Sequence, residues 1–175
     1  MKNQRLKIDI VESFRKFRAF SESIIKLESD IQKDDRLAVI IICAAVESVL
    51  DFLVENVFKH GSKFSKLHFK NKVKLLDEFG VIDDKILNNL TNLKTLRNTA
   101  AHEPQKEVEW KGKFAFDKNS TVYKETVKVF RKPKNLFEYL YCVWNTFFLV
   151  ALEEITRKQF GKIVVAHKKL TKSNK

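Results

Sequence analysis

The residues with the most pointed chemistry are Arg97, Asn98 and His102, which share one short segment. An imidazole changes charge near neutral pH, so a histidine can act as a general acid or base. A neighbouring guanidinium can hold a phosphate and stabilise the charge of a phosphoryl transition state. An amide can orient the histidine or a phosphate oxygen. These are the parts needed for metal-independent RNA cleavage, in which the neighbouring ribose 2′-OH is the nucleophile.

Arg97 is unusual because it continues an apolar stripe that includes Leu90 and Leu93. Burying an unpaired guanidinium is costly because the charge loses its hydration. Three explanations fit. Arg97 pairs with an internal acid, for which Glu47 and Asp51 are the obvious candidates; it lies at a subunit interface; or it lines a cleft and binds an anionic ligand.

His102 follows Arg97 by five residues, near the expected end of the same helix. On a regular helix this step is a rotation of about 140°, so the two side chains would not share a face. Pro104 permits the helix to end or loosen there, which would let the imidazole swing back beside Arg97. The competing structural interpretation is that His102 caps the helix while Arg97 forms a buried ion pair.

The elements that position these residues are predicted to be helices. Apolar residues at three- and four-residue steps predict helices over about 5–30, 35–58, 65–79, 83–102 and 134–159. Asp34 and Asp35, and likewise Asp83 and Asp84, are typical of helix starts, and Gly80 is a typical terminator. The helix over 35–58 is apolar nearly all round at its start, so we expect it to be the central one.

The 175 residues predict one domain with a hydrophobic core. We expect an all-α fold, a bundle of four to five helices over residues 1–160. Imperfect alternation over about 105–132 predicts a small β-hairpin or an extended insertion before the last helix. Residues 161–175 carry five lysines and no acid, and we expect a frayed basic tail.

The insertion interleaves aromatic and basic residues. Trp110, Phe114 and Phe116 lie beside Lys111 and Lys113. Such rings can stack unpaired bases next to phosphate-binding charges, as in single-strand binders. The favoured alternative is that the rings pack the insertion onto the bundle.

The formal net charge of +12 favours polyanionic partners. RNA, DNA and anionic membranes are all compatible with this charge, and so is a lysine-rich surface without a partner. Cys43 and Cys142 lie in apolar helical stretches, where free cysteines behave as small hydrophobes. Neither a disulfide framework nor a metal-ligand set is indicated, and no cofactor is predicted.

A cytoplasmic location without membrane insertion is also predicted. The chain starts with an amphipathic helix rather than a signal sequence. Its most apolar run, Leu37 to Val46, is shorter than a bilayer requires and is followed by Glu47 and Asp51.

The stretch from Leu87 to His102, with its Arg97–Asn98–Thr99–Ala100–Ala101–His102 segment, resembles the signature of the HEPN superfamily. That signature is an Arg, a polar residue, a short spacer and a His at the end of a helix in a helical bundle. Residues 69–82 and Ala44–Leu50 resemble the mannitol-repressor-like and DUF4145-like branches. The resemblance extends over about residues 35–103.

This resemblance implies a homodimer in which the motif helices of both chains meet. Many HEPN domains are endoribonucleases of toxin–antitoxin or phage-defence systems. It implies that Arg97 and His102 are the catalytic pair and that Asn98 supports them. Glu47 matches an acidic position that would orient Arg97, and Asp51, one turn later, is assigned to the same supporting role.

The primary hypothesis is therefore a metal-independent endoribonuclease that acts as a homodimer on RNA. Lys94, Lys111 and Lys113 are the candidate phosphate contacts. An antitoxin or regulatory protein is a further expected partner, although the Tyr that usually follows the His in HEPN toxins with nucleotidyltransferase antitoxins is replaced here by Glu103–Pro104–Gln105. The alternatives are a non-catalytic mannitol-repressor-like regulator or adaptor, and a non-specific nucleic-acid-binding module.

Overall fold

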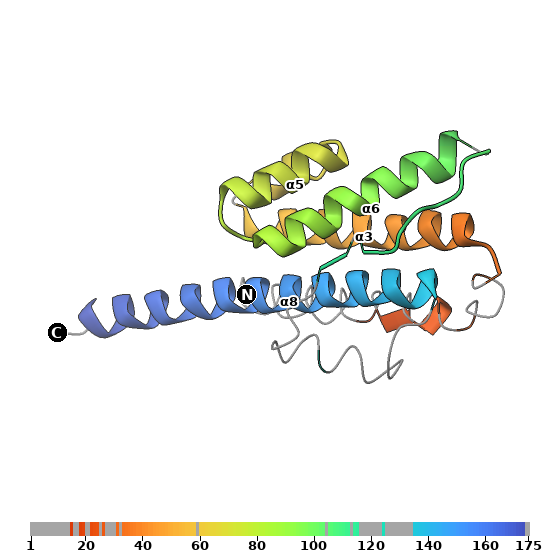
Figure 1. The fold of residues 1–175 in the computed structure, drawn as a ribbon. Helices are drawn as coiled ribbons and strands as arrows, with labels where there is room; N and C mark the ends of the chain where they lie inside the picture. Colours follow the sequence, from red (N-terminus) through yellow and green to blue (C-terminus); the bar gives the residue numbers. More distant parts are fainter. Residues whose placement is uncertain are drawn as a thin grey trace.

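The computed structural model describes residues 15, 18–19, 22–24, 26, 31, 33–58, 60–103, 105–112, 114–115, 124 and 135–173. The helices with defined bounds are α3 (Asp35–Val57), α4 (Gly61–Phe64), α5 (Phe69–Glu78), α6 (Asp84–His102) and α8 (Leu136–Ser173). They form an all-α bundle, as predicted (Figure 1). Of the helix expected over 5–30, the described residues, such as Glu22–Ile24, are helical and the others lie outside the described set.

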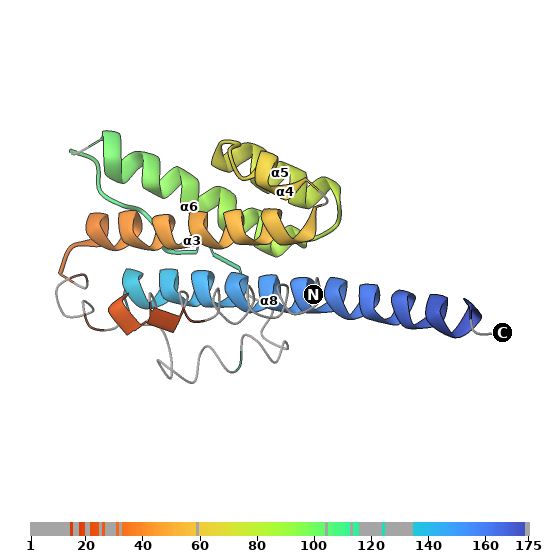
Figure 2. The ribbon, with the colours of Figure 1, turned by 180° about the vertical axis from the view of Figure 1, so that it is seen from behind.

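Helix α3 is the centre of the bundle. Both views show it between α6 on one side and α8 on the other (Figures 1 and 2), and it also contacts α4 and α5. Its core residues are almost fully buried on both of these sides: Ala38, Val39, Ile42, Cys43, Ala45, Val46, Val49, Leu50, Leu53 and Val54. The prediction of a central helix over 35–58 is confirmed.

The helix ends follow the residues that marked them in the sequence. The Asp34 carboxylate accepts hydrogen bonds from the first-turn amides of α3, and that of Asp83 accepts one from Ile86 N at 2.8 Å. Gly80 has a φ of 61°, the left-handed conformation that ends α5 without a side-chain clash. Helix α5 begins at Phe69 rather than near Ser65. The separate short helix α4 ends at Phe64, and residues 65–68 form the turn between the two helices.

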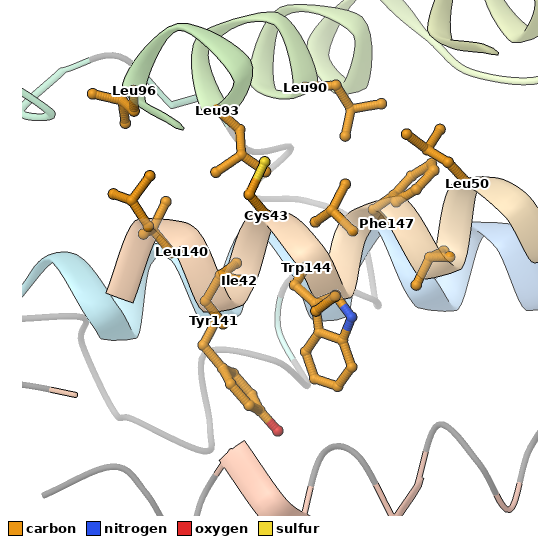
Figure 3. Close-up of a cluster of buried hydrophobic side chains, with 14 of the residues drawn as sticks. Ile42, Cys43, Leu50, Leu90, Leu93, Leu96, Leu140, Tyr141, Trp144 and Phe147 are labelled. Carbon is orange, nitrogen blue, oxygen red and sulfur yellow. The ribbon is translucent and has the colours of Figure 1, made fainter. Parts of the chain in front are cut away.

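Helix α6 packs through one stripe of leucines. Leu90, Leu93 and Leu96 face α3, and Cys43 points from α3 toward Leu93 (Figure 3). Each buried leucine stabilises the fold by about 1.5–3 kcal/mol. Tyr141 and Trp144 of α8 point to the opposite side of the core. This packing fixes how α6 is rotated, and therefore which of its residues reach the surface.

After α6, the described residues of 105–115 form an irregular segment that contacts α6. The side chain of Asn89 pairs with Ala115 at both ends of its amide: Nδ2 donates to Ala115 O at 2.7 Å, and Oδ1 accepts from Ala115 N at 2.8 Å. Val108 is buried in the core. No strand occurs among the described residues of the 105–132 insertion, so its described part matches the extended alternative rather than the hairpin.

Helix α8 is longer than predicted. It continues to Ser173, so the expectation of a frayed tail over 161–175 is wrong for the backbone. Lysine and leucine are good helix formers, no proline interrupts the stretch, and the isolated Gly161 costs only about 1 kcal/mol relative to alanine. The end of α8 extends beyond the other helices (Figure 1).

Two helices, Asp35–Val57 and Leu136–Lys158, are long and apolar enough to cross a membrane by length and composition. The apolar stretch of α3 is thus longer than the Leu37–Val46 run considered from the sequence. About half or more of the most apolar stretch in each helix is buried inside the bundle. The core helix of a soluble protein passes the same test, so this is weak evidence for a membrane.

Candidate functional site

The last two turns of α6 carry Arg97, Asn98 and His102, and all three are exposed. Of the three explanations for Arg97, the exposed position disagrees with the buried ion pair and leaves the subunit interface and the ligand-binding cleft open. Arg97 lies four residues beyond Leu93 and about 40° around the helix from it, between Leu93 and Leu90 in angle, so its exposure does not follow from the angle alone. A long side chain can cover apolar surface with its stem while its guanidinium stays in water.

Helix α6 does not loosen before His102. The Glu103 amide donates to Thr99 O at 3.0 Å, the regular helical pattern, and Glu103 is the C-cap. A loosened helix end, which would let the imidazole swing back beside Arg97, is therefore not what the structure shows. Within one chain the two residues are separated by about 140° around the helix and about 7.5 Å along it, with Asn98 between them in angle.

None of these three side chains has a hydrogen bond or ion pair within the described part of the chain. The structural interpretation, with Arg97 in a buried ion pair and His102 as a cap, is not what the fold shows. Three polar groups that bind water rather than the rest of the chain are available for a ligand.

Glu47 and Arg97 approach the same point from α3 and α6. The pKa of the Cys43 thiol is raised to about 12: burial is the main cause, the Glu47 carboxylate also raises it, and the Arg97 guanidinium lowers it. Both charges therefore act on one thiol at the α3–α6 contact. They are not joined by an ion pair in the described residues, so Glu47 lies near Arg97 without a direct bond to it.

Asp51 is engaged elsewhere. It forms an ion pair with Lys72, whose side chain is only 10% exposed, whereas that of Asp51 is 43% exposed. This pair joins α3 to α5, on which Lys72 lies. The prediction that Asp51 supports Arg97 is therefore wrong, because the carboxylate already balances a buried ammonium.

Arg36 lies in the first turn of α3 and holds the end of α6, although no sequence pattern indicated this role. Its guanidinium donates to backbone carbonyls around His102: Thr99 (3.4 Å), Ala100 (2.9 Å), Glu103 (2.8 Å) and Lys106. The carbonyls at a helix C-terminus lack intrahelical partners and carry partial negative charge, so an arginine is well suited to bind them. No local spacing signals a contact across more than sixty residues.

The candidate phosphate-binding lysines are not gathered in one place. Lys94, half-buried on α6, precedes Asn98 by one turn and so shares its side of the helix. Lys111 is exposed and lies in a turn near Ala115, the residue that Asn89 of α6 binds. Asn89 precedes Arg97 by more than two helical turns. Lys113 lies outside the described residues.

The aromatic residues of the insertion pack inward. The ring of Trp110 lies 4.9 Å from that of Tyr139 between centroids, and Phe114 packs against the core. The packing interpretation is confirmed for these two residues, and Phe116 lies outside the described set. The base-stacking interpretation is therefore wrong for Trp110 and Phe114.

An apolar stripe on α3 borders this surface. Leu37 and Ile40 are 39% and 44% exposed, and Ala44 and Glu47 continue the same side at helical spacing. Large exposed apolar side chains in a row are typical of interaction surfaces. Among the described residues, no group of three or more His, Cys, Asp or Glu is placed to hold a metal ion.

Residues 27–170 match the model of the family described as Domain of unknown function (DUF4145). The match includes all of α3, α4, α5 and α6 and most of α8. Searches of the curated proteins and of the solved structures found no match.

Proposed function

The chain belongs to the DUF4145 family, and from the chemistry of its α6 surface we propose that it is a metal-independent endoribonuclease of HEPN type, active as a homodimer. The observation that carries the proposal is the exposure of Arg97, Asn98 and His102 on consecutive turns of α6, without partners in the described chain. This is the residue set that resembles the HEPN signature. Its function in a toxin–antitoxin or phage-defence system is part of the same proposal.

The spread of these residues around α6 favours a site completed by a second copy. A catalytic pair must approach one phosphate, yet the regular helix turns Arg97 and His102 about 140° apart. When two such helices meet about a two-fold axis, each chain's surface faces the other's, and groups from both can surround one phosphate. The exposed Leu37 and Ile40 supply apolar area beside this contact.

The proposed reaction uses only protein side chains and the ribose. One His102 imidazole removes the proton of the 2′-OH, and that oxygen attacks the adjacent phosphorus. The bond from phosphorus to the 5′-oxygen breaks, and the imidazolium of the second His102 in the dimer protonates the leaving oxygen. The products are a 2′,3′-cyclic phosphate and a 5′-hydroxyl. Arg97 stabilises the charge on the non-bridging oxygens, and Asn98 orients the phosphate.

The first experiment is cleavage of a mixed RNA pool in the presence of EDTA. We expect the wild type to cleave, and His102→Ala and Arg97→Ala to lose most of that activity while remaining folded. His60→Ala is the matched control because His60 is also exposed but lies at the far end of α3. Folded wild type of dimeric mass, measured by native mass spectrometry, that leaves all RNAs intact would contradict the proposal.

The two alternatives give different results in the same experiment. A mannitol-repressor-like regulator would not cleave RNA and would act by binding another protein. In this hypothesis Arg97 and His102 have a purely structural role, and the absence of hydrogen bonds or ion pairs from their side chains in the described chain argues against that role. A non-specific nucleic-acid-binding module gives RNA binding that weakens steeply with salt and does not depend on His102.

A further inference from the structure

We propose that Arg36 is the positioning residue of His102, and that it acts by fixing the backbone on both sides of that residue. The catalytic consequence of this inference rests on the proposed ribonuclease function. The positional part does not, because it concerns only where the imidazole is held. The two parts are therefore tested by separate measurements.

The contacts of Arg36 bracket His102 in the sequence. One terminal nitrogen, Nη1, donates to Ala100 O at 2.9 Å and to Thr99 O at 3.4 Å, before His102. The other, Nη2, donates to Glu103 O at 2.8 Å and to Lys106 O, after it. A planar guanidinium has rigidly spaced donors, so one side chain can connect the last turn of the helix to the segment that leaves it.

His102 is in need of such a support. It is the last residue of α6, where helices fray, and its own side chain forms no hydrogen bond in the described chain. Of its neighbours, Ala100 is buried, whereas Ala101 and Glu103 are exposed. The other bonds at this turn are local: the Glu103 amide donates to Thr99 O, and Lys106 bonds to Glu103. The bonds from Arg36 connect the turn to α3.

Arg36 is itself held by the most buried helix. It lies in the first turn of α3, and its amide donates to the Asp34 carboxylate at 2.9 Å. Through Arg36, the end of α6 is thus attached to the central helix α3. A proton-transfer group requires such a fixed position, since a displacement of about 1 Å can reduce a rate by roughly 100-fold.

The direct test is the NMR signal of the histidine ring C–H groups in Arg36→Gln. The chain has four histidines, and His102→Ala assigns the signal of interest. We expect the His102 signal to broaden or split in Arg36→Gln, while those of His60 and His68 stay unchanged. Arg157→Gln is the matched control, because this exposed arginine pairs only with α8's own Glu154 in the described chain.

The catalytic test measures kcat and KM of the Arg36→Gln variant separately. We expect Arg36→Gln to lower kcat about 10- to 100-fold with little change in KM, because Arg36 positions the imidazole and does not hold RNA. Arg36→Lys should restore part of kcat, since it keeps the charge but lacks the fork that reaches carbonyls on both sides.

An unchanged His102 signal in folded Arg36→Gln would overturn the inference. If that variant does not fold, the same measurement on Arg36→Lys decides, and a wild-type His102 signal with wild-type kcat would again overturn it. If the wild type itself does not cleave RNA, the ribonuclease proposal fails, while the NMR comparison still tests whether Arg36 positions His102.

Discussion

At the scale of single residues, Arg97, Asn98 and His102 are exposed and form no hydrogen bond or ion pair in the described chain. Their substitution should therefore affect a ligand more than the fold. This separates a functional role from a structural one without knowing the ligand.

Asn98 provides the sharpest form of this prediction. We expect Asn98→Ala to leave the Tm within about 2 °C of the wild type, because exposed substitutions away from special contacts change stability by less than about 0.5 kcal/mol. RNA cleavage should fall about 100-fold if the amide orients the phosphate. Thermal unfolding and initial rates check both. A large loss of Tm would show that Asn98 is structural.

Cys43 gives a prediction about pH. Burial raises the pKa of its thiol from 9.0 to about 12, so the folded state keeps the proton after the unfolded state has lost it. This contribution to stability is complete below pH 9 and is lost as the pH rises from 9 toward 12. The free energy of unfolding in urea should therefore decrease between pH 8 and 10.5, and less steeply in Cys43→Ala. Equal slopes in both proteins would contradict this assignment.

At the scale of elements, the pair of Asp51 and Lys72 shows that α5 is attached by a charge. Removing the carboxylate leaves the nearly buried Lys72 ammonium unpaired, whereas removing the ammonium leaves Asp51 partly in water. We expect Asp51→Ala to cost about 3 kcal/mol of unfolding free energy, and Lys72→Met to cost less. Urea unfolding of both variants measures this difference. Cleavage should be retained in both, because neither residue contacts the motif; a reversed order of stability would contradict the asymmetry.

The boundaries of the elements could largely be predicted from the sequence, and their mutual contacts could not. Asp83, Gly80 and the end at His102 are local signals, since a cap or a glycine acts on its own turn. The bonds from Arg36 to the end of α6 depend on how α3 and α6 pack, which periodicity does not encode. Arg97 illustrates both: it continues the apolar series of Leu90 and Leu93, but its exposure depends on the packing around the end of α6, which a local pattern does not encode.

At the scale of the whole molecule, the proposed activity requires association. Ile40 is exposed on α3 beside the α6 surface and has no role in the core. We expect Ile40→Glu to remain folded but to become monomeric, and to lose RNA cleavage with it, because a charge in an apolar contact is not compensated. Phe79→Ser is the matched control, since Phe79 is 65% exposed at the end of α5. A dimeric Ile40→Glu protein would place the contact elsewhere.

The length of α8 has a practical consequence for such measurements. Its 38 residues span about 57 Å. A compact chain of this size has a radius of gyration of about 16 Å, which corresponds to a sphere only about 40 Å across. A molecule with a protruding rod experiences more friction than a sphere of equal mass. It should therefore leave a gel-filtration column early, and a monomer would imitate a dimer by elution volume. Light scattering, which reports mass independently of shape, distinguishes the two.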